Sequence, residues 1–149
     1  LANTRSRLRM TTLYYYAGIY NLLVAGTGNK IEDFGIGFFT KYGDGGVDLS
    51  PIGDLTKTQV YQLGKELDIL PEIMAAPPTD GLFGDNRTDE DQIGASYPEL
   101  EWAMDFHGDE KQLSQRQKEV LEIYRKRHRQ NLHKINPIPI CEIPEELKV

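Results

Sequence analysis

The first part of the chain carries apolar residues at helical spacing. Residues 4 to 20 are predicted to form a helix, with Asn3 as the side chain that caps its start. One face of this helix carries Leu8, Thr12, Tyr15 and Ile19. Further apolar residues at positions 10, 13, 14 and 17 widen that face, so we expect the helix to be buried on two sides.

A short, fully apolar stretch at residues 22 to 26 predicts a strand of the kind found in parallel sheets that are covered on both faces. Residues 31 to 39 fit no single pattern. The stretch from 40 to 57 is predicted to be a loop, because it is rich in glycine and also holds a proline and three aspartates. Only the segments near 36 to 40 and 48 to 52 offer further candidate strands.

Amphipathic spacing predicts a second helix at residues 56 to 69, with Thr56 as its cap. The residues expected to face inward on it are Val60, Leu63, Leu67 and Ile69. Residues 71 to 94 should be mostly loop, and helices are expected at 96 to 105 and at about 110 to 130. The proline-spaced tail that follows is predicted to be extended.

The order of helix, short apolar strand and helix predicts an α/β fold built on a parallel sheet. A single convincing strand cannot form a sheet by itself, so we expect other strands to lie outside this stretch of sequence. The chain also begins at Leu1, directly in the first predicted helix. We therefore expect it to be a piece of a longer protein.

Composition narrows the class of protein. The 149 residues are 39% hydrophobic, which is enough for one globular domain. The single cysteine, Cys141, excludes an internal disulfide framework and a cysteine-based zinc site, so a cytoplasmic location is expected. No apolar run approaches the roughly 20 residues of a membrane-spanning helix, which argues against a membrane role. The net charge of −6 argues against a nucleic-acid partner, and we interpret the locally basic run at 124 to 134 as a solvated helix end.

The stretch VAGTGNKIED, residues 24 to 33, lies where the predicted strand ends, a common place for ligands in open α/β sheets. It fits neither the dinucleotide fingerprint G-x-G-x-x-G nor the Walker loop. Thr27 and Glu32 could nevertheless hold a phosphate oxygen and its Mg²⁺, because magnesium takes one or two protein carboxylates and leaves its other positions to phosphates and water. The alternative is that Thr27 caps a helix and that Glu32 and Asp33 only favour its amino end.

The stretch TKYGDGGVD places Lys41, Asp44 and Asp48 around three glycines. It lacks the spacing of a calcium-binding EF-hand loop. A lysine and two aspartates on one loop suit a ligand with anionic groups and hydroxyls, such as a nucleotide with its ribose, and a plain surface turn is the alternative.

Two further residues are candidates for ligand contact. Lys57 begins a helix, where the helix dipole disfavours a cation, and Thr79 follows two prolines in PPTDGL. The acidic run DNRTDEDQIG is interpreted as the capped start of a helix rather than a metal site. No arrangement of a nucleophile with a histidine base is visible, so no catalytic residue is assigned.

Together these stretches resemble one family, the ammonia-dependent NAD synthetases of the ATP pyrophosphatase superfamily. The resemblance covers nearly the whole chain and rests on RLRM (7 to 10), GTGNKIED (26 to 33), GFFTKYGDGGVDLSPIGDLTKTQV (37 to 60), PPTDGL (77 to 82), TDEDQIGASYPEL (88 to 100) and HK (133 to 134). It implies a Rossmann-like parallel sheet flanked by helices, of the adenine nucleotide α-hydrolase type.

The resemblance also implies a reaction. In this family the carboxylate of deamido-NAD attacks ATP, pyrophosphate leaves, and ammonia displaces AMP from the acyl-adenylate to give NAD. The positions that match ATP-binding residues are Thr27, Lys57 and Thr79. Those that match metal ligands for Mg²⁺ are Glu32 and Thr79. Those that match deamido-NAD contacts are Arg7, Lys41, Asp44, Asp48, His133 and Lys134. The family is homodimeric.

Two departures from the family pattern stand out. The family's phosphate loop, S-G-G-x-D-S, is absent, so residues 1 to 149 are expected to be the carboxyl-terminal portion of a single synthetase domain and to be inactive alone. One additional residue separates Glu32 from Lys41 relative to some members. The alternatives are another ATP pyrophosphatase, such as a GMP synthetase, or a non-catalytic dinucleotide-binding or interface module. The sequence does not decide whether ammonia or glutamine is the nitrogen donor.

Overall fold

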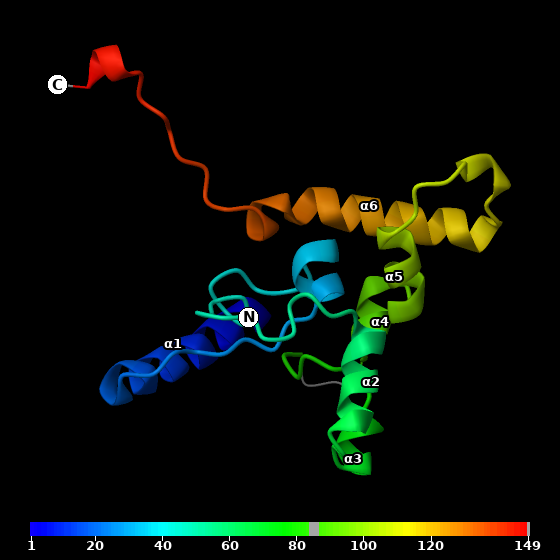
Figure 1. Ribbon diagram of the computed structural model, residues 1–149, viewed down its shortest axis with the longest axis horizontal. Helices are drawn as coiled ribbons and strands as arrows, with labels where there is room; N and C mark the ends of the chain where they lie inside the picture. Colours follow the sequence, from blue (N-terminus) through cyan, green and yellow to red (C-terminus); the bar gives the residue numbers. More distant parts are fainter. Residues whose placement is uncertain (84–86, 149) are drawn as a thin grey trace.

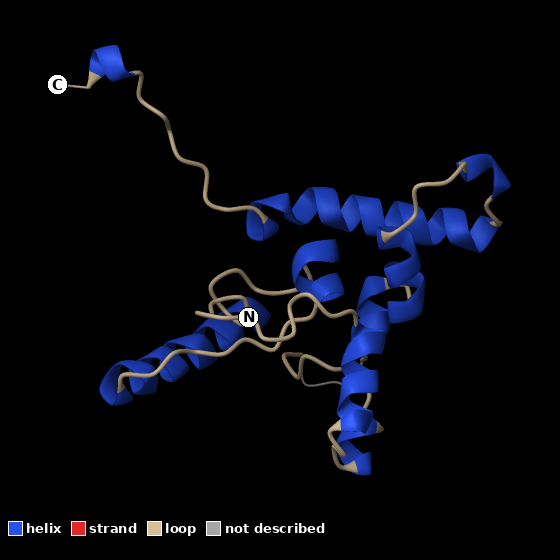
Figure 2. Cartoon of the chain, viewed as in Figure 1, coloured by secondary structure: helices blue, strands red, loops and turns tan. Residues whose placement is uncertain are grey.

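The computed structural model describes residues 1–83 and 87–148, and the regular structure in these ranges is helical (Figures 1 and 2). The longer helices are α1 (Ala2–Tyr20), α2 (Lys57–Glu66), α5 (Tyr97–Met104) and α6 (Gln115–Ile135). The shorter ones are η1 (Lys30–Ile36), α3 (Pro71–Met74), α4 (Asp89–Ile93), η2 (Glu110–Gln112) and η3 (Glu145–Leu147). No helix among the described residues is both long and apolar enough to cross a membrane.

The core lies where α5, α6 and η1 meet, and Figure 1 shows α6 running along one side of the molecule with α5 against it. Nine buried residues form it: Ile31, Ile36, Ile93, Ala95, Tyr97, Leu100, Ala103, Val120 and Leu121. Four of these come from α5 and the turn before it, so the segment from 95 to 103 is central to the packing. This arrangement holds η1, which carries Glu32, against two longer helices.

The predicted strand at 22 to 26 is wrong as a strand. The chain is extended there, but within the described residues the pairing is one parallel bridge, between Ala25 and Leu49. The amide of Gly26 donates to the carbonyl of Leu49 at 2.8 Å, and Asp48 donates its amide to the carbonyl of Val24 at 2.9 Å. An apolar run becomes a strand only when neighbouring strands complete its ladder, and within residues 1–83 and 87–148 the backbone of residues 24 to 26 pairs with residues 48 and 49 alone.

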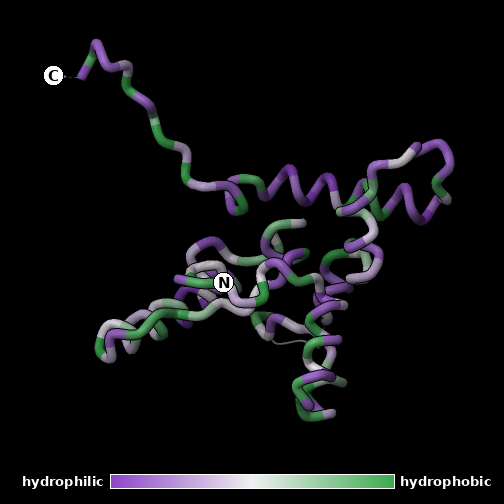
Figure 3. Tube along the Cα trace, in the orientation of Figure 1, coloured by the Kyte–Doolittle hydropathy of each residue, from purple (hydrophilic) through white to green (hydrophobic). Residues whose placement is uncertain are grey.

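The first helix is confirmed, but its cap and its burial are not. It begins at Ala2, so Asn3 lies inside the helix and the position before it is Leu1, which provides no side-chain cap. Only Ser6 and Ala17 are buried on it. Its exposed apolar side chains are Leu8, Leu13, Tyr15, Tyr16, Ile19 and Tyr20, and Figure 3 shows hydrophobic positions along this helix and the segment after it. The expectation of burial on two sides is therefore wrong for this chain, because no described element covers that face.

Capping patterns predicted where the other helices begin better than apolar patterns predicted which of their faces are buried. Thr56 caps α2 with Gln59 in a reciprocal pair, as expected. The predicted inward placement is wrong for Leu63, Leu67 and Ile69, which are exposed. The main packing partner of α2 among the described elements is α5, and it does not cover these side chains. The last helix starts later than expected, because Ser114 and Gln117 cap it reciprocally. The tail after residue 136 is extended and exposed, as predicted, apart from η3.

Candidate functional site

The turn that leads into η1 is built by one asparagine. The Asn29 side chain accepts from the amides of Ile31 and Glu32, at 3.0 and 3.1 Å, and the Glu32 carboxylate reaches back to the amide of Asn29. This reciprocal cap fixes the start of the helix, so the alternative role of Thr27 as the cap is wrong. Glu32 lies in the first turn of η1, as the alternative to a metal role predicted. Only its Oε2 takes part in the cap.

The helix η1 is a π-helix, in which the amide of Gly37 bonds to the carbonyl of Glu32, five residues back. Gly37 has a φ of 62°, a conformation that favours glycine, and a Cβ there would lie 2.4 Å from the Asn131 side chain. A π turn holds more residues than an α turn, so η1 is wider than an α-helix of the same length would be.

The basic run at the end of α6 is more than a solvated helix end. His128, Asn131 and Lys134 lie three residues apart along α6 and donate to the carbonyls of residues 35, 36 and 39, at 2.6, 2.8 and 2.7 Å. These side chains satisfy backbone oxygens at the carboxyl end of η1 that the helix itself leaves unpaired. They therefore lock η1 and the loop after it onto α6.

Glu32 and Lys57, assigned to the metal and to ATP, meet in the structure. The Lys57 Nζ lies 3.1 Å from Glu32 Oε1, and the side chains are 22% and 15% exposed. The hydroxyl of Tyr97 donates to the same oxygen at 2.5 Å. The lysine ammonium also lies 4.8 Å from the centre of the Tyr97 ring. We call Glu32, Lys57, Tyr97 and Asp89 the carboxylate cluster.

Asp89 is the fourth member of the cluster. It is buried, and its Oδ2 lies 3.5 Å from the Tyr97 hydroxyl. Its Oδ1 has no hydrogen-bond partner within the described residues. Burial, followed by the charges of Glu32 and Asp80, raises the pKa of Asp89. Burial and the Glu32 carboxylate likewise raise the pKa of Tyr97, so its hydroxyl stays protonated and donates.

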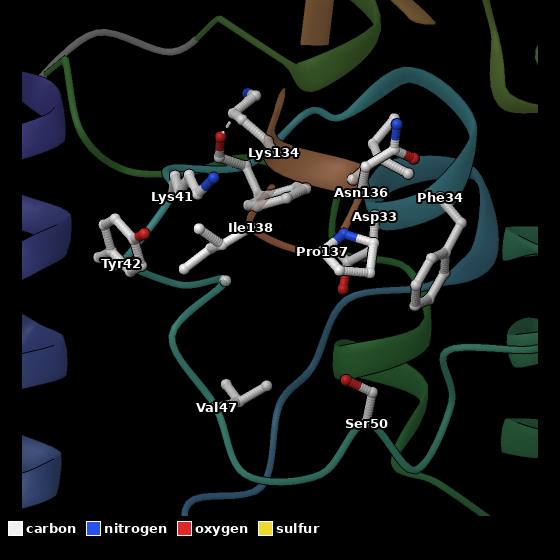
Figure 4. A pocket seen from close by; sticks show the side chains of 13 residues that line it. Asp33, Phe34, Lys41, Tyr42, Val47, Ser50, Lys134, Asn136, Pro137 and Ile138 are labelled. Carbon is white, nitrogen blue, oxygen red and sulfur yellow. Dashed lines mark hydrogen bonds between the residues drawn. The ribbon is translucent and has the colours of Figure 1, made fainter. Parts of the chain in front are cut away.

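A cavity of about 280 Å³ lies between the loop after η1 and the end of α6 (Figure 4). Its polar lining includes Asp33, Lys41 and Lys134, and its apolar lining includes Phe34, Phe39, Val47 and Ile138. Lys41 donates to the carbonyl of His133, and the Lys134 ammonium lies 4.9 Å from the centre of the Phe39 ring. Burial lowers the pKa of Lys134. We call this space the lysine cavity.

Asp33 faces the glycine turn from the wall of the lysine cavity. A Cβ placed on Gly28 would lie 2.1 Å from an Asp33 carboxylate oxygen, so only glycine fits beneath this side chain. Burial and the charge of Glu32 raise the pKa of Asp33 from 3.8 to about 6. Asp33 thus does more than favour the start of a helix.

The remaining residues matched to deamido-NAD contacts lie outside the lining of the lysine cavity. Arg7 is adjacent to it, because its Nε donates to the carbonyl of Lys41 at 3.2 Å. Asp44 accepts from the Ser6 hydroxyl and the Thr40 amide, at 2.7 and 3.0 Å, and so ties the loop to α1. Asp48 accepts from the amide of Val24 at 2.8 Å. The side chain of His133 is exposed.

The two threonines matched to ATP contacts, Thr27 and Thr79, are exposed and lie on loops. Asp80, next to Thr79, is close enough to Asp89 for its charge to raise the pKa of that carboxyl group. Within the described residues no group of three His, Cys, Asp or Glu side chains could enclose a metal ion. Glu32 Oε1 accepts from Lys57 and Tyr97, and Oε2 accepts from the amide of Asn29, so Oε2 keeps room for one more partner. A single carboxylate of this kind fits Mg²⁺ that is held mainly by substrate phosphates and water.

Tyr97, Asp89 and Asp33 were not found from the sequence. Thr88 and Asp91 form the reciprocal cap of α4, so the interpretation of the acidic run as a capped helix start is confirmed for residues 87 to 94, and residues 85 and 86 lie outside the described residues. Asp89 lies in the first turn of α4, and its position in the sequence predicts no contact beyond that turn. Tyr97 lies 65 residues from Glu32, and no local pattern predicts a contact over that distance.

Comparison with known proteins gives consistent matches. The family model of NAD synthase matches residues 1–137. An NH(3)-dependent NAD(+) synthetase of Carboxydothermus hydrogenoformans is 52% identical over 101 residues, covering 68% of this chain and 41% of that protein. The corresponding protein of Mycoplasma genitalium is 42% identical over 130 residues, covering 87% of this chain and 51% of its own length. The chain thus spans about half or less of these relatives.

Two solved structures are similar to this one. The NMN synthetase of Francisella tularensis superposes with a TM-score of 0.80 at 38% identity, over 97% of this chain and 56% of that one. The NH3-dependent NAD synthetase of Campylobacter jejuni superposes with a TM-score of 0.66 at 28% identity, over 94% of this chain and 54% of that one. The helices and loops described above therefore follow a path shared by solved synthetases.

Proposed function

The chain belongs to the NAD synthase family, and on that premise we propose that it is the carboxyl-terminal portion of one NAD synthetase domain. Its relatives share the adenine nucleotide α-hydrolase fold, although the parallel sheet of that fold remains an expectation for this protein. The S-G-G-x-D-S loop would come from elsewhere in the complete domain. Another ATP pyrophosphatase, such as a GMP synthetase, is not favoured by the matches.

The proposed reaction is the ATP-dependent amidation of deamido-NAD by ammonia. The deamido-NAD carboxylate attacks ATP to give an acyl-adenylate and pyrophosphate, and ammonia then displaces AMP. The observation that carries the proposal is the contact of Glu32 with Lys57, at 3.1 Å across 25 residues of sequence. The resemblance assigns one to the metal and the other to ATP, and a surface salt bridge would not need to join those two positions.

Each of the two regions of the site would bind one of the two nucleotide substrates. At the carboxylate cluster, Glu32 would hold Mg²⁺ together with Thr79 from its exposed loop, and Lys57 would contact ATP together with Thr27 and Thr79. Bound there, Mg²⁺ would offset the charge of the triphosphate. In the lysine cavity, Lys41 and Lys134 would contact deamido-NAD, with Arg7, Asp44, Asp48 and His133 as the flanking contacts.

Electrostatics supports this division. Carboxylate activation brings two anions together, so cations must offset their repulsion before attack is possible. Lys41 and Lys134 donate to neutral carbonyls, of His133 and Phe39, that an anionic ligand could replace. Lys57 is paired with a carboxylate instead, and a metal ion on Glu32 would leave that lysine available to a phosphate.

A second candidate function is the amidation of nicotinate mononucleotide, which would give NMN. The similarity to the NMN synthetase of Francisella tularensis, with the higher of the two TM-scores, favours it. The curated relatives at up to 52% identity are NAD synthetases, so we place deamido-NAD first. The two candidates differ only in the adenylate half of the substrate.

A homodimer and a cytoplasmic location are also part of the proposal. The apolar face of α1 is exposed, with Leu8, Tyr15 and Ile19 more than half exposed, and such a face suits a subunit contact or a contact within the complete domain. Light scattering of the full-length protein should give a dimer mass. A mass that stays monomeric at all concentrations would contradict the dimer.

The test of function uses the full-length protein that contains this chain. Amide product is measured with MgATP and ammonium, with either deamido-NAD or nicotinate mononucleotide as the acceptor, and glutamine replaces ammonium in a parallel series. We expect NAD from deamido-NAD with a higher kcat/KM than for the mononucleotide. The opposite preference would favour NMN synthesis, and no product from either would contradict both functions.

A further inference from the structure

The Tyr97 side chain joins the hydrophobic core to the carboxylate cluster. The residue is 3% exposed, and its ring packs with Leu100, Ala103 and the other core residues. Its hydroxyl leaves the core and reaches Glu32 Oε1 at 2.5 Å. The position of the carboxylate is thereby tied to α5, the helix on which the core is built.

Two carboxylates compete for this one hydroxyl hydrogen. Glu32 lies at 2.5 Å and Asp89 at 3.5 Å, so the hydrogen points to Glu32. The other oxygen of Asp89 is buried without a partner in the described part of the chain. A buried carboxylate with an unused oxygen, next to a second carboxylate, does not stabilise a fold. The cluster is therefore more than a satisfied core tyrosine.

We propose that Tyr97 is a positioning residue that holds the Glu32 carboxylate beside Lys57 in the orientation needed to receive the metal–nucleotide complex. The inference rests on the proposed function, because that function gives Glu32 its metal. Groups that hydrogen-bond a metal ligand commonly fix its orientation, and their loss weakens metal affinity or activity by 10–100-fold.

The position of Asp89 supports this role. Its Oδ2 lies 3.5 Å from the same hydroxyl that donates to Glu32, so two carboxyl groups flank one hydroxyl, an arrangement that a cation on Glu32 would stabilise. Lys57 supplies one cation and is itself shared between Glu32 and the Tyr97 ring. The cluster has two carboxylates for one lysine, which favours a further cation on the Glu32 side.

The test is Tyr97→Phe in the full-length protein, which keeps the ring and removes the hydroxyl. ATP binding is measured by calorimetry across a Mg²⁺ titration and again in EDTA, together with the melting temperature. We expect the Mg²⁺ midpoint to rise about 10–100-fold, while ATP binding in EDTA changes less than about twofold and the melting temperature falls by no more than about 2–4 °C.

The matched control is Tyr124→Phe, which removes a hydroxyl from a partly buried tyrosine that packs against the same core as the buried Tyr97. It should leave the Mg²⁺ midpoint unchanged. An unchanged midpoint in Tyr97→Phe, an equal loss of ATP binding in EDTA, or failure of Tyr97→Phe to fold would overturn the positioning role. If the wild-type protein makes no amide product at all, the proposed function fails first, so the two failures are distinguishable.

Discussion

The carboxylate cluster and the lysine cavity differ in how their charged groups are held. In the cluster, side chains from η1, α2 and α5 bind one another directly, and each is mostly buried. In the cavity, lysines from a loop and from the end of α6 donate to backbone carbonyls, and the space beside them is open (Figure 4). The cluster is organised before a ligand arrives, whereas the cavity lysines can exchange a neutral partner for a charged one.

This difference has a physical consequence for each region. An anion adds Coulomb attraction that a neutral carbonyl cannot offer, so an anion can displace a carbonyl from Lys41 or Lys134. Lys57 has a carboxylate partner, and a phosphate must compete with Glu32 for it. A cation on Glu32 would remove that competition. The cavity is thus expected to bind its anion without metal, and the cluster only with it.

The largest expected effect comes from Glu32→Gln. Adenylation should fall by orders of magnitude, because metal charge stabilisation is worth several kcal/mol in the transition state. The melting temperature should change little, since the amide can still cap η1. Pyrophosphate release by the full-length protein is measured across a Mg²⁺ titration. The control is Glu66→Gln at the exposed end of α2, which should behave as wild type. Wild-type rates and an unchanged Mg²⁺ midpoint in Glu32→Gln would show that Glu32 does not bind the metal.

Lys134→Gln tests whether the lysine cavity binds deamido-NAD independently of the carboxylate cluster. It should weaken deamido-NAD binding by about 1.5–3 kcal/mol, the range for a charged hydrogen bond, and leave MgATP binding unchanged. The KM for each substrate is measured in steady state. Lys118→Gln, on an exposed position of the same helix, serves as the control and should change neither value. A rise of both KM values together would argue against separate regions.

Arg7→Ala should act in the same direction with a smaller effect. Its guanidinium is exposed and donates to the carbonyl of Lys41, so water screens much of its charge. We expect deamido-NAD to bind about 1.5 kcal/mol more weakly, at the lower end for a charged hydrogen bond, with ATP little affected. Binding of each substrate is measured separately. Equal losses for the two substrates would contradict the assignment of Arg7.

Asp33→Asn gives the smallest effect, and its sign depends on pH. The pKa of Asp33 is about 6 in the folded protein against a reference value of 3.8, so protonation favours the fold. That stabilisation is complete below about pH 3.8 and is lost as the pH rises through about 6. The asparagine variant should therefore be more stable than wild type by on the order of 1 kcal/mol at pH 8, after solvent screening, and equal to it near pH 4. Urea unfolding at the two pH values measures this, and a constant difference would show that the charge is not responsible.

Local patterns predicted the helices but not what covers them. Thr56 marked the start of α2 because a cap acts within four residues, and the glycine-rich stretch after η1 is a loop as expected. The strand at 22 to 26 and the buried face of α1 failed, because both depend on neighbours distant in the sequence. An apolar pattern predicts that a face is buried, but it does not identify the element that buries it.

The candidate site was predicted only through the family resemblance. Spacing alone left Glu32 and Lys57 as weak signals, since neither indicates a partner 25 residues away. Asp44 and Asp48 were assigned to a ligand, and in the structure their carboxylates brace the backbone at Thr40 and Val24. Their contacts with deamido-NAD remain predictions. Tyr97 and Asp89 were missed because the contacts that give them meaning form only in three dimensions.

The most direct test of the two separate regions is a crossed binding measurement by calorimetry. Deamido-NAD without metal, and MgATP without deamido-NAD, are each titrated into full-length wild type, Glu32→Gln and Lys134→Gln. We predict that Glu32→Gln weakens only MgATP and that Lys134→Gln weakens only deamido-NAD, each by tenfold or more, as the loss of a charged contact of about 1.5 kcal/mol or more requires. Equal weakening of both ligands by either variant would contradict the division of the site.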